Sequence, residues 1–285
     1  MNEYQIKAFA KINLGLDVVG RLENGYHQVR MIMQTVGIYD ELTLERTASG
    51  IIVTTDCGEL PTDENNLVYK AAKLMKEHYG ISQGLRIHLK KKIPIAAGMA
   101  GGSTDAAAAM KGINRLFDLG CTLEELVELG VAIGADVPYC VMGGTALAEG
   151  IGEKLTALVP APDCYVLVAK PDINVSTKYV YEHLDATGIK KHPDIDGMAA
   201  AIEAGSLQGI LDRMENVLES VTVKAYPVIH TLKNRMKELG AVNSLMSGSG
   251  PTVFGIFIEK ETAQRAYDQI RSEQLAKQVF VTEFC

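Results

Sequence analysis

The stretch PIAAGMAGGSTDAA, Pro94 to Ala107, constrains the fold of this chain most strongly, because three glycines and five alanines leave it almost without bulky side chains. It follows a β-rich segment that ends near Lys90 and precedes a helical pattern that begins at Ser103 or Thr104. The chain therefore passes from a strand to a helix through a bare loop. Since glycine loses backbone entropy on folding, such a cluster indicates either a ligand close to the backbone or a tight bend.

A loop that leads into a helix N-terminus suits an anion. The first N–H groups of a helix have no intrahelical acceptor, and the macrodipole adds partial positive charge there. Ser103 or Thr104 can cap this helix or ligate a magnesium ion carried by phosphates, and Asp105 is interpreted as an ordinary first-turn carboxylate. The spacing matches neither GxxxxGK[ST] nor GxGxxG. Glycine content alone leaves phosphate binding and close packing as equal alternatives.

Charge argues against a nucleic-acid partner. The 285 residues carry 28 Lys and Arg against 35 Asp and Glu, for a formal net charge of -7. The basic residues are scattered apart from the run Lys90 to Lys92. A protein that binds a phosphate backbone normally gathers basic residues on one face. We therefore expect any nucleotide bound here to be small.

Cysteine usage and hydropathy indicate a cytoplasmic location. The five cysteines are an odd number, widely spaced, and form no CxxC pair. Neither a disulfide framework nor a zinc site is predicted, and reduced thiols are the simpler interpretation. The apolar N-terminal segment is interrupted by Lys7 and Lys11, and no run has the length of a membrane span. We expect no membrane partner.

The order of elements predicts an α+β fold rather than a regular βαβ alternation. Strands are predicted at Tyr4–Phe9, Leu14–Val19, Glu41–Leu44, Ile51–Thr55, Leu85–Lys90, Tyr165–Ala169, Thr252–Ile258 and Val279–Thr282. Helices are predicted after Asn66, from Ser103 or Thr104, from a capping box at Thr122 and Glu125, and around Leu207–Leu218, Tyr226–Gly240 and Thr262–Glu273. A boundary between two lobes is expected near residues 150 to 160, with lobes at 1–155 and 156–285.

Two further motifs accompany the bare loop. AKINLGLDVVGRLENGYH places Lys11 inside an apolar strand-like segment, and SLMSGSGPTVF places Gly248, Ser249 and Gly250 just before a strand. Together the three motifs resemble the GHMP small-molecule kinase superfamily. GYH and GADVP, Gly134 to Pro138, resemble its branch that phosphorylates a cytidine diphosphate sugar alcohol.

The resemblance implies a fold and a reaction. The expected fold is the two-lobed GHMP kinase fold, with an N-terminal lobe like ribosomal protein S5 domain 2 that binds ATP, a C-terminal α/β sandwich lobe that contributes to the substrate site, and the active site in the cleft. The expected reaction transfers the γ-phosphoryl group of ATP to the 2-hydroxyl of the sugar alcohol. Magnesium is expected to be carried by ATP, with Ser103 a ligand and no site made by protein alone. A monomer and a homodimer both remain open.

The catalytic pair implied by the resemblance is Lys11 and Asp136. Asp136 would accept or orient the hydroxyl proton, and Lys11 would hold both groups. Taken locally, Lys11 would instead be a surface residue of an edge strand and Asp136 a turn former. Their coincidence with the glycine loop favours catalysis.

The binding residues also follow from the resemblance. ATP and its phosphates are assigned to Asn66, Pro94, Ala97, Gly98, Met99, Ala100, Gly101, Gly102, Ser103 and Thr104. The cytidyl substrate is assigned to Asn13, Tyr26, His27, Thr177 and Tyr181, with Tyr179 competing for the stacking role. An ordinary helix cap at Asn66 and an ordinary helix face at Tyr181 are the alternatives. Where many relatives carry consecutive glycines this loop has Ala96 and Ala97, a departure that we expect the phosphate cradle to tolerate.

Two other functions stay open at this stage. A sibling kinase for homoserine or mevalonate would share the loop but not GYH, and a non-catalytic binding module would be expected to lack Lys11 or Asp136 or to carry a basic face. Fold analogy alone does not decide between them.

Overall fold

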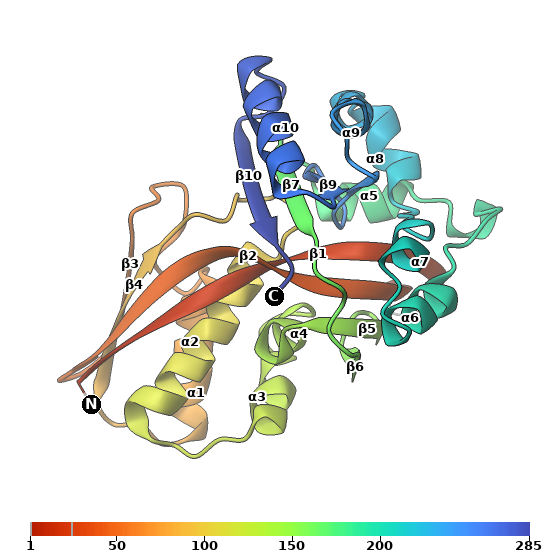
Figure 1. Cartoon of the computed structure of the whole chain (residues 1–285). Helices are drawn as coiled ribbons and strands as arrows, with labels where there is room; N and C mark the ends of the chain where they lie inside the picture. Colours follow the sequence, from red (N-terminus) through yellow and green to blue (C-terminus); the bar gives the residue numbers. More distant parts are fainter. Residues whose placement is uncertain (1, 24) are drawn as a thin grey trace. The chain divides into compact units, whose positions relative to one another are not determined.

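The computed structural model (Figure 1) describes residues 2–23 and 25–285. The chain forms two compact units. Unit 1 consists of Met1–Ala10, Ile38–Ile95 and Ala100–Gly143. Unit 2 consists of Lys11–Gly37, Ala96–Met99 and Gly144–Cys285. These units divide the chain differently from a single cut near residue 155, and the lobes 1–155 and 156–285 stay a prediction.

Unit 1 packs helices on a small sheet. The long strands β1 (Glu3–Arg21) and β2 (His27–Thr47) pair with each other and contribute residues to both units. In unit 1, β4 (Gly84–Lys90) pairs antiparallel with β2 and parallel with β3 (Ile51–Thr55). The helices are α1 (Leu67–His78), α2 (Gly101–Phe117), α3 (Leu123–Gly130) and α4 (Val137–Met142). Helices α1 and α2 pack on each other, and α2 buries its alanine run in the core with Leu42, Leu44 and Ile87.

Unit 2 contains part of the first sheet and the whole of a second sheet. In the first sheet, β5 (Thr145–Gly150) pairs antiparallel with β2 and with β6 (Lys154–Ala157). The second sheet is antiparallel, in the order β10 (Gln278–Glu283), β7 (Tyr165–Lys170), β9 (Val253–Phe257) and β8 (Asn243–Met246). The helices are α5 (Thr177–His183), a 3-10 turn η1 (Ala186–Gly188), α6 (Ile195–Glu203), α7 (Leu207–Leu211), α8 (Glu219–Ala225), α9 (Val228–Glu238) and α10 (Lys260–Ser272). Helices α9 and α10 pack on strands of this second sheet.

The α+β class is confirmed, and most predicted elements are present with shifted ends. The strands predicted at 4–9 and 14–19 are one strand, β1, because its residues are buried on both faces from Ala10 to Val18 and the alternating pattern disappears there. The predicted helix 207–218 is wrong in its second half, because α7 ends at Leu211. The helix predicted from Ser103 or Thr104 begins earlier, at Gly101.

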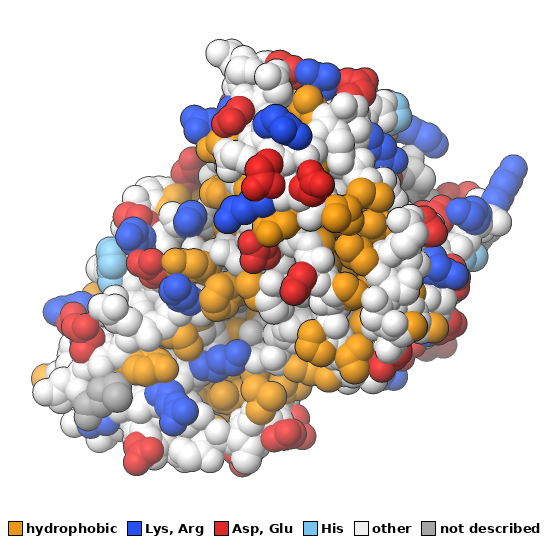
Figure 2. All heavy atoms as spheres, viewed as in Figure 1, with side chains coloured by type: hydrophobic (Ala, Val, Ile, Leu, Met, Phe, Trp, Pro, Cys, Tyr) orange, Lys and Arg blue, Asp and Glu red, His pale blue; other side chains and the backbone are white. Residues whose placement is uncertain are grey.

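On the face shown in Figure 2, Lys and Arg are interspersed with Asp and Glu rather than gathered into a basic area. Within the part of the chain that the structure describes, no helix combines the length and apolar character needed to cross a bilayer.

Candidate active site

The N-terminus of α2 offers backbone donors. Ala100 is its N-cap, with φ 56° and ψ 29°, and no side chain among the described residues caps the helix there. The first bond back along the helix runs from the Thr104 N–H to the Ala100 carbonyl, at 2.9 Å. The N–H groups of residues 101–103 therefore lack an intrahelical acceptor, as an anion site requires. Gly102 is exposed and Ser103 half-buried, which leaves this end of α2 accessible.

The capping role considered for Ser103 and Thr104 is wrong. Ala100 occupies the cap position, so Ser103 lies in the first turn of the helix. The Thr104 hydroxyl donates to the Phe9 carbonyl at 2.6 Å and is buried. Thr104 thus fastens α2 to β1 within unit 1, and Ser103 presents the hydroxyl nearer to solvent.

The preceding loop residues, Ala96 to Met99, belong to unit 2 together with the Ser247–Gly250 segment. The Ser247 hydroxyl donates to the Gly98 carbonyl at 2.9 Å. A Cβ on Gly98 would lie 2.2 Å from the Ser247 carbonyl oxygen, and Gly98 has φ +69°. Both the close approach and the left-handed backbone therefore require glycine at this position.

Lys11 and Asn13 form a buried polar pair on β1. Lys11 is 5% exposed and Asn13 0%. The Lys11 ammonium donates to Asn13 Oδ1 at 2.7 Å, and the Asn13 amide reaches Met31 Sδ at 3.2 Å. The Lys11 backbone N–H donates to the Met99 carbonyl at 3.2 Å. The interpretation of Lys11 as a surface residue of an edge strand is therefore wrong.

Aromatic rings meet at the start of β2. The rings of His27 and Tyr181 lie 5.1 Å apart with an interplanar angle of 34°. Burial, together with the charge of Arg21, lowers the pKa of the His27 imidazole, so it is neutral at pH 7. Tyr179 packs on His183 instead, with ring centroids 4.0 Å apart. Of the two competing tyrosines, Tyr181 is the one beside His27.

The other substrate residues lie at the surface of unit 2. Tyr26 is 60% exposed. Thr177, the first residue of α5, shares a hydrogen bond of 2.8 Å with Ser249 in the glycine motif. The structure therefore brings together α5 and the Gly248–Gly250 motif, two segments that lie far apart in the sequence.

The remaining predicted residues lie in unit 1. Asn66 is the N-cap of α1: its Oδ1 accepts from the Val68 N–H at 2.8 Å, and its amide donates to the Pro61 carbonyl at 2.7 Å. The cap interpretation is confirmed, and any contact of Asn66 with a base is additional to it. Asp136 is the half-buried N-cap residue of α4, and within the described chain it makes no side-chain capping bond. Pro94 is buried.

Comparisons with known proteins identify the family. Models of the GHMP kinase N-terminal and C-terminal domains match residues 66–144 and 198–277. The chain belongs to the GHMP kinases. A 4-diphosphocytidyl-2-C-methyl-D-erythritol kinase of Lachnospira eligens is 57% identical, with 99% of each chain covered. One of Lachnoclostridium phytofermentans is 53% identical, covering 100% of this chain and 98% of its own.

Two solved structures agree with this chain in fold. A crystal structure of 4-(cytidine 5'-diphospho)-2C-methyl-D-erythritol kinase aligns with a TM-score of 0.84 at 31% identity, with 99% of each chain covered. The homoserine kinase of Cytophaga hutchinsonii aligns with a TM-score of 0.75 at 23% identity over 98% of this chain and 93% of its own, a likeness of fold alone. Full-length similarity therefore groups this GHMP kinase with the 4-diphosphocytidyl-2-C-methyl-D-erythritol kinases.

Sequence reasoning missed two groups of buried residues, one in each unit. Asp40, Lys91 and Asp105 form an ion cluster in unit 1, whereas the sequence pattern predicts Asp105 as an ordinary first-turn carboxylate and shows Lys91 only as part of the basic run Lys90 to Lys92. In unit 2, the Asn216 amide donates to the Met246 and Gly248 carbonyls, each at 2.8 Å. The available signal was Asp105 at the head of an alanine run, since a carboxylate on a buried helix face needs a partner.

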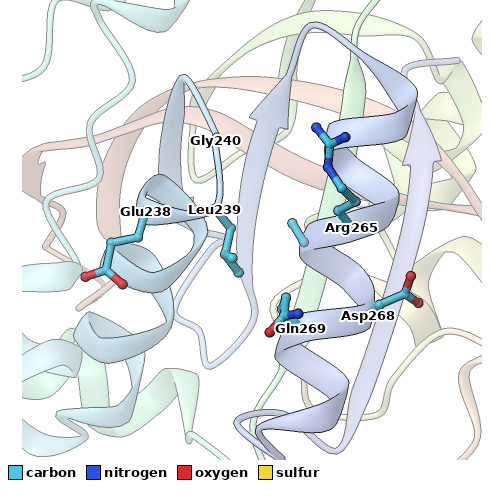
Figure 3. Close-up of a pocket in the computed structure, with 7 residues that line it drawn as sticks. Glu238, Leu239, Gly240, Arg265, Asp268 and Gln269 are labelled. Carbon is cyan, nitrogen blue, oxygen red and sulfur yellow. The ribbon is translucent and has the colours of Figure 1, made fainter.

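A separate surface pocket in unit 2 contains none of the predicted site residues. It is lined by Arg265, Asp268 and Gln269 of α10 and by Glu238, Leu239 and Gly240 at the end of α9 (Figure 3).

Proposed function

We propose that this GHMP kinase transfers the γ-phosphoryl group of ATP to the 2-hydroxyl of 4-diphosphocytidyl-2-C-methyl-D-erythritol, giving the 2-phosphate and ADP in non-mevalonate isoprenoid precursor biosynthesis. The observation that carries the proposal is 57% identity over 99% of the chain to a kinase named for that substrate. The reaction requires ATP, and we place it in the cytoplasm.

The nucleotide is assigned to the N-terminus of α2 and the loop before it. Backbone N–H groups of residues 101–103 would receive phosphate oxygens, and Asn66 would lie near the adenine. We assign magnesium to the ATP phosphates, with the half-buried Ser103 hydroxyl as one ligand. Magnesium bound to ATP supplies neutralisation of phosphate charge.

Lys11 and Asp136 are assigned to the chemistry. Phosphoryl transfer depends on placing two oxygens in line and neutralising charge on the moving group. The Lys11 ammonium, oriented by Asn13 at 2.7 Å, supplies a fixed positive charge. The Asp136 carboxylate accepts the proton of the attacking hydroxyl or orients it, and no capping bond to α4 ties that carboxylate down within the described chain.

The cytidyl end is assigned to unit 2. His27 and Tyr181 are aromatic surfaces for a base, and neutral His27 can hydrogen-bond the base edge. Tyr26, Asn13 and Thr177 complete the substrate set, with the Gly248–Gly250 motif held to Thr177 through Ser249.

The first experiment is a coupled ADP-release assay with magnesium ATP. The acceptors compared are the diphosphocytidyl methylerythritol, homoserine, mevalonate and none. Turnover with the cytidyl compound alone supports the proposal. Turnover with another alcohol would replace the substrate but keep the kinase, and no turnover with any acceptor would favour a binding module.

Substitution of the assigned base tests the mechanism. Asp136→Asn should lower kcat by about a hundredfold to ten-thousandfold, the usual contribution of a general base, and leave ATP affinity nearly intact. The matched control is Asp268→Asn, an exposed carboxylate on α10, which should keep wild-type kcat. Wild-type turnover in Asp136→Asn would make Asp136 a turn residue and require another base.

A further inference from the structure

Asp40, Lys91 and Asp105 form a buried charged clamp in unit 1. The Lys91 ammonium contacts both carboxylates, with 2.7 Å to Asp105 Oδ2 and a close contact to Asp40 Oδ2. The side chains are 7%, 0% and 3% exposed for Lys91, Asp40 and Asp105. Charged side chains are almost never buried this deeply unless they are paired, so the clamp calls for an explanation.

The clamp joins the two ends of the glycine loop. At its start, Asp40 Oδ1 accepts from the N–H groups of Lys92 and Ile93, at 2.5 and 2.8 Å. At its end, Asp105 lies in the first turns of α2. Lys91 spans the gap between them, and its ammonium lies 3.4 Å from where a Cβ on Gly101 would stand. One cation therefore fixes the loop entrance relative to the helix N-terminus.

Opposing effects act on the charges of the clamp. Burial lowers the pKa of Lys91, but the charges of Asp105 and Asp40 raise it by more, so Lys91 stays protonated. Burial raises the pKa of Asp105 well above its usual range, against the opposing pull of Lys91. Among the described residues Asp105 Oδ1 is buried without a hydrogen-bond partner, an expensive position for a carboxylate oxygen.

We propose that Lys91, through its bond to Asp105, is a positioning residue for nucleotide binding: it sets the direction in which the first N–H groups of α2 point. This inference rests on the proposed function of that N-terminus as the phosphate site. Hydrogen-bond donors act on a phosphate only if they are held in place before it arrives, which is why a displacement of about 1 Å far from the reacting atoms can weaken a site greatly.

A pair of substitutions at one position isolates the bond. Asp105→Asn and Asp105→Ala both remove the carboxylate, but only asparagine keeps an oxygen for the Lys91 ammonium. Asp105→Ala should weaken ADP binding, measured by calorimetry, and raise KM for ATP by about tenfold, while KM for the cytidyl acceptor changes by less than about twofold. Asp105→Asn should restore ADP affinity to within about twofold of wild type. The control Lys90→Met removes an exposed neighbour and should change neither constant.

The outcomes separate this inference from the proposed function. Wild-type ADP affinity in Asp105→Ala would overturn the positioning role, and so would an equal weakening of nucleotide and acceptor. If the wild-type protein itself neither binds ADP nor releases it from ATP, the proposed function fails instead. Should Asp105→Ala not fold, the triple variant Asp40→Asn, Lys91→Met and Asp105→Leu removes all three charges of the clamp together, a change that folds tolerate, and it should show the same loss of ADP affinity.

Discussion

Different kinds of side chain hold the two glycine loops of this kinase, the loop before α2 and the Gly248–Gly250 loop. The loop before α2 is fastened in unit 1 by the ions Asp40, Lys91 and Asp105. The Gly248–Gly250 loop is bound in unit 2 by neutral donors: Asn216 donates to the Met246 and Gly248 carbonyls, and Thr222 donates to the Ser249 carbonyl at 3.2 Å, while the Glu219 carboxylate accepts from the Met246 N–H before the loop. Ions fix a loop at the expense of desolvation and respond to pH, whereas amides and hydroxyls do not titrate.

The loops also differ in backbone strain. In the C-terminal loop the residues with positive φ are glycines, Gly248 at 57° and Gly250 at 87°. In the loop before α2, Ala96 at φ 50° and Ala100 at φ 56° take the same left-handed conformation with a Cβ present. That conformation costs an L-residue roughly 1–2 kcal/mol. The charged clamp thus holds a loop in which two alanines are left-handed, whereas Asn216 and Thr222 bind a loop in which the left-handed residues are glycines.

The largest expected effect on stability comes from removing the Lys91 cation. Lys91→Met leaves two buried carboxylates facing each other and should lower the free energy of unfolding by about 3–5 kcal/mol at pH 8. A proton on Asp105, whose folded pKa lies above its unfolded value, stabilises the fold at low pH, and that contribution is lost as pH rises. The loss should therefore be smaller at pH 5 than at pH 8. Urea unfolding at both pH values measures it, with Lys90→Met as the control. An equal loss at both pH values would contradict a charged clamp.

Removing the Asn216 side chain should lower the free energy of unfolding somewhat less than removing the Lys91 cation does. Asn216→Ala leaves the Met246 and Gly248 carbonyls and the Leu218 N–H without their partner, for a loss of about 3 kcal/mol. Because Asn216 does not titrate, the same urea series should give an equal loss at pH 5 and pH 8. Asn234→Ala, on the exposed face of α9, is the control. A pH-dependent loss here would remove the distinction between the two loops.

The smallest expected effect on stability tests the backbone strain at Ala96 and Ala100. Ala96→Gly and Ala100→Gly should each raise the free energy of unfolding by about 0.5 kcal/mol, since relief of the left-handed penalty exceeds the extra entropy of the unfolded chain. Ala97→Gly is the control, because Ala97 is buried and its φ is not positive, and it should destabilise. Thermal unfolding compares the three, and destabilisation by all of them would show that the loop before α2 stores no strain.

Local features of this fold were predictable from the sequence, and partners distant along the chain were not. The capping box of Thr122 and Glu125 is confirmed with both of its bonds, because all its atoms lie within one turn. The helix cap at Asn66 is confirmed for the same reason. Asp40, by contrast, meets Lys91 across 51 residues, and no local pattern marks either as buried.

The candidate site follows the same division. The bare loop and its helix were predictable because small residues and helical spacing are local signals. Lys11 needed the resemblance, since a lysine in an apolar strand is locally a surface residue, and its burial depends on packing on both faces of β1. Asn216 had no signal at all, because its partners are carbonyls about thirty residues away whose exposure only the fold decides.

The contact between Gly98 and Ser247 limits how this enzyme can be engineered. With only 2.2 Å from a Cβ at residue 98 to the Ser247 carbonyl oxygen, the two loops fit as one piece although 149 positions separate them. If the loop before α2 were replaced by the loop of another kinase, it would not fit the Ser247 segment unless the C-terminal loop of that kinase were transferred with it. Recombination between such kinases at a crossover anywhere between the two loops would part a matched pair.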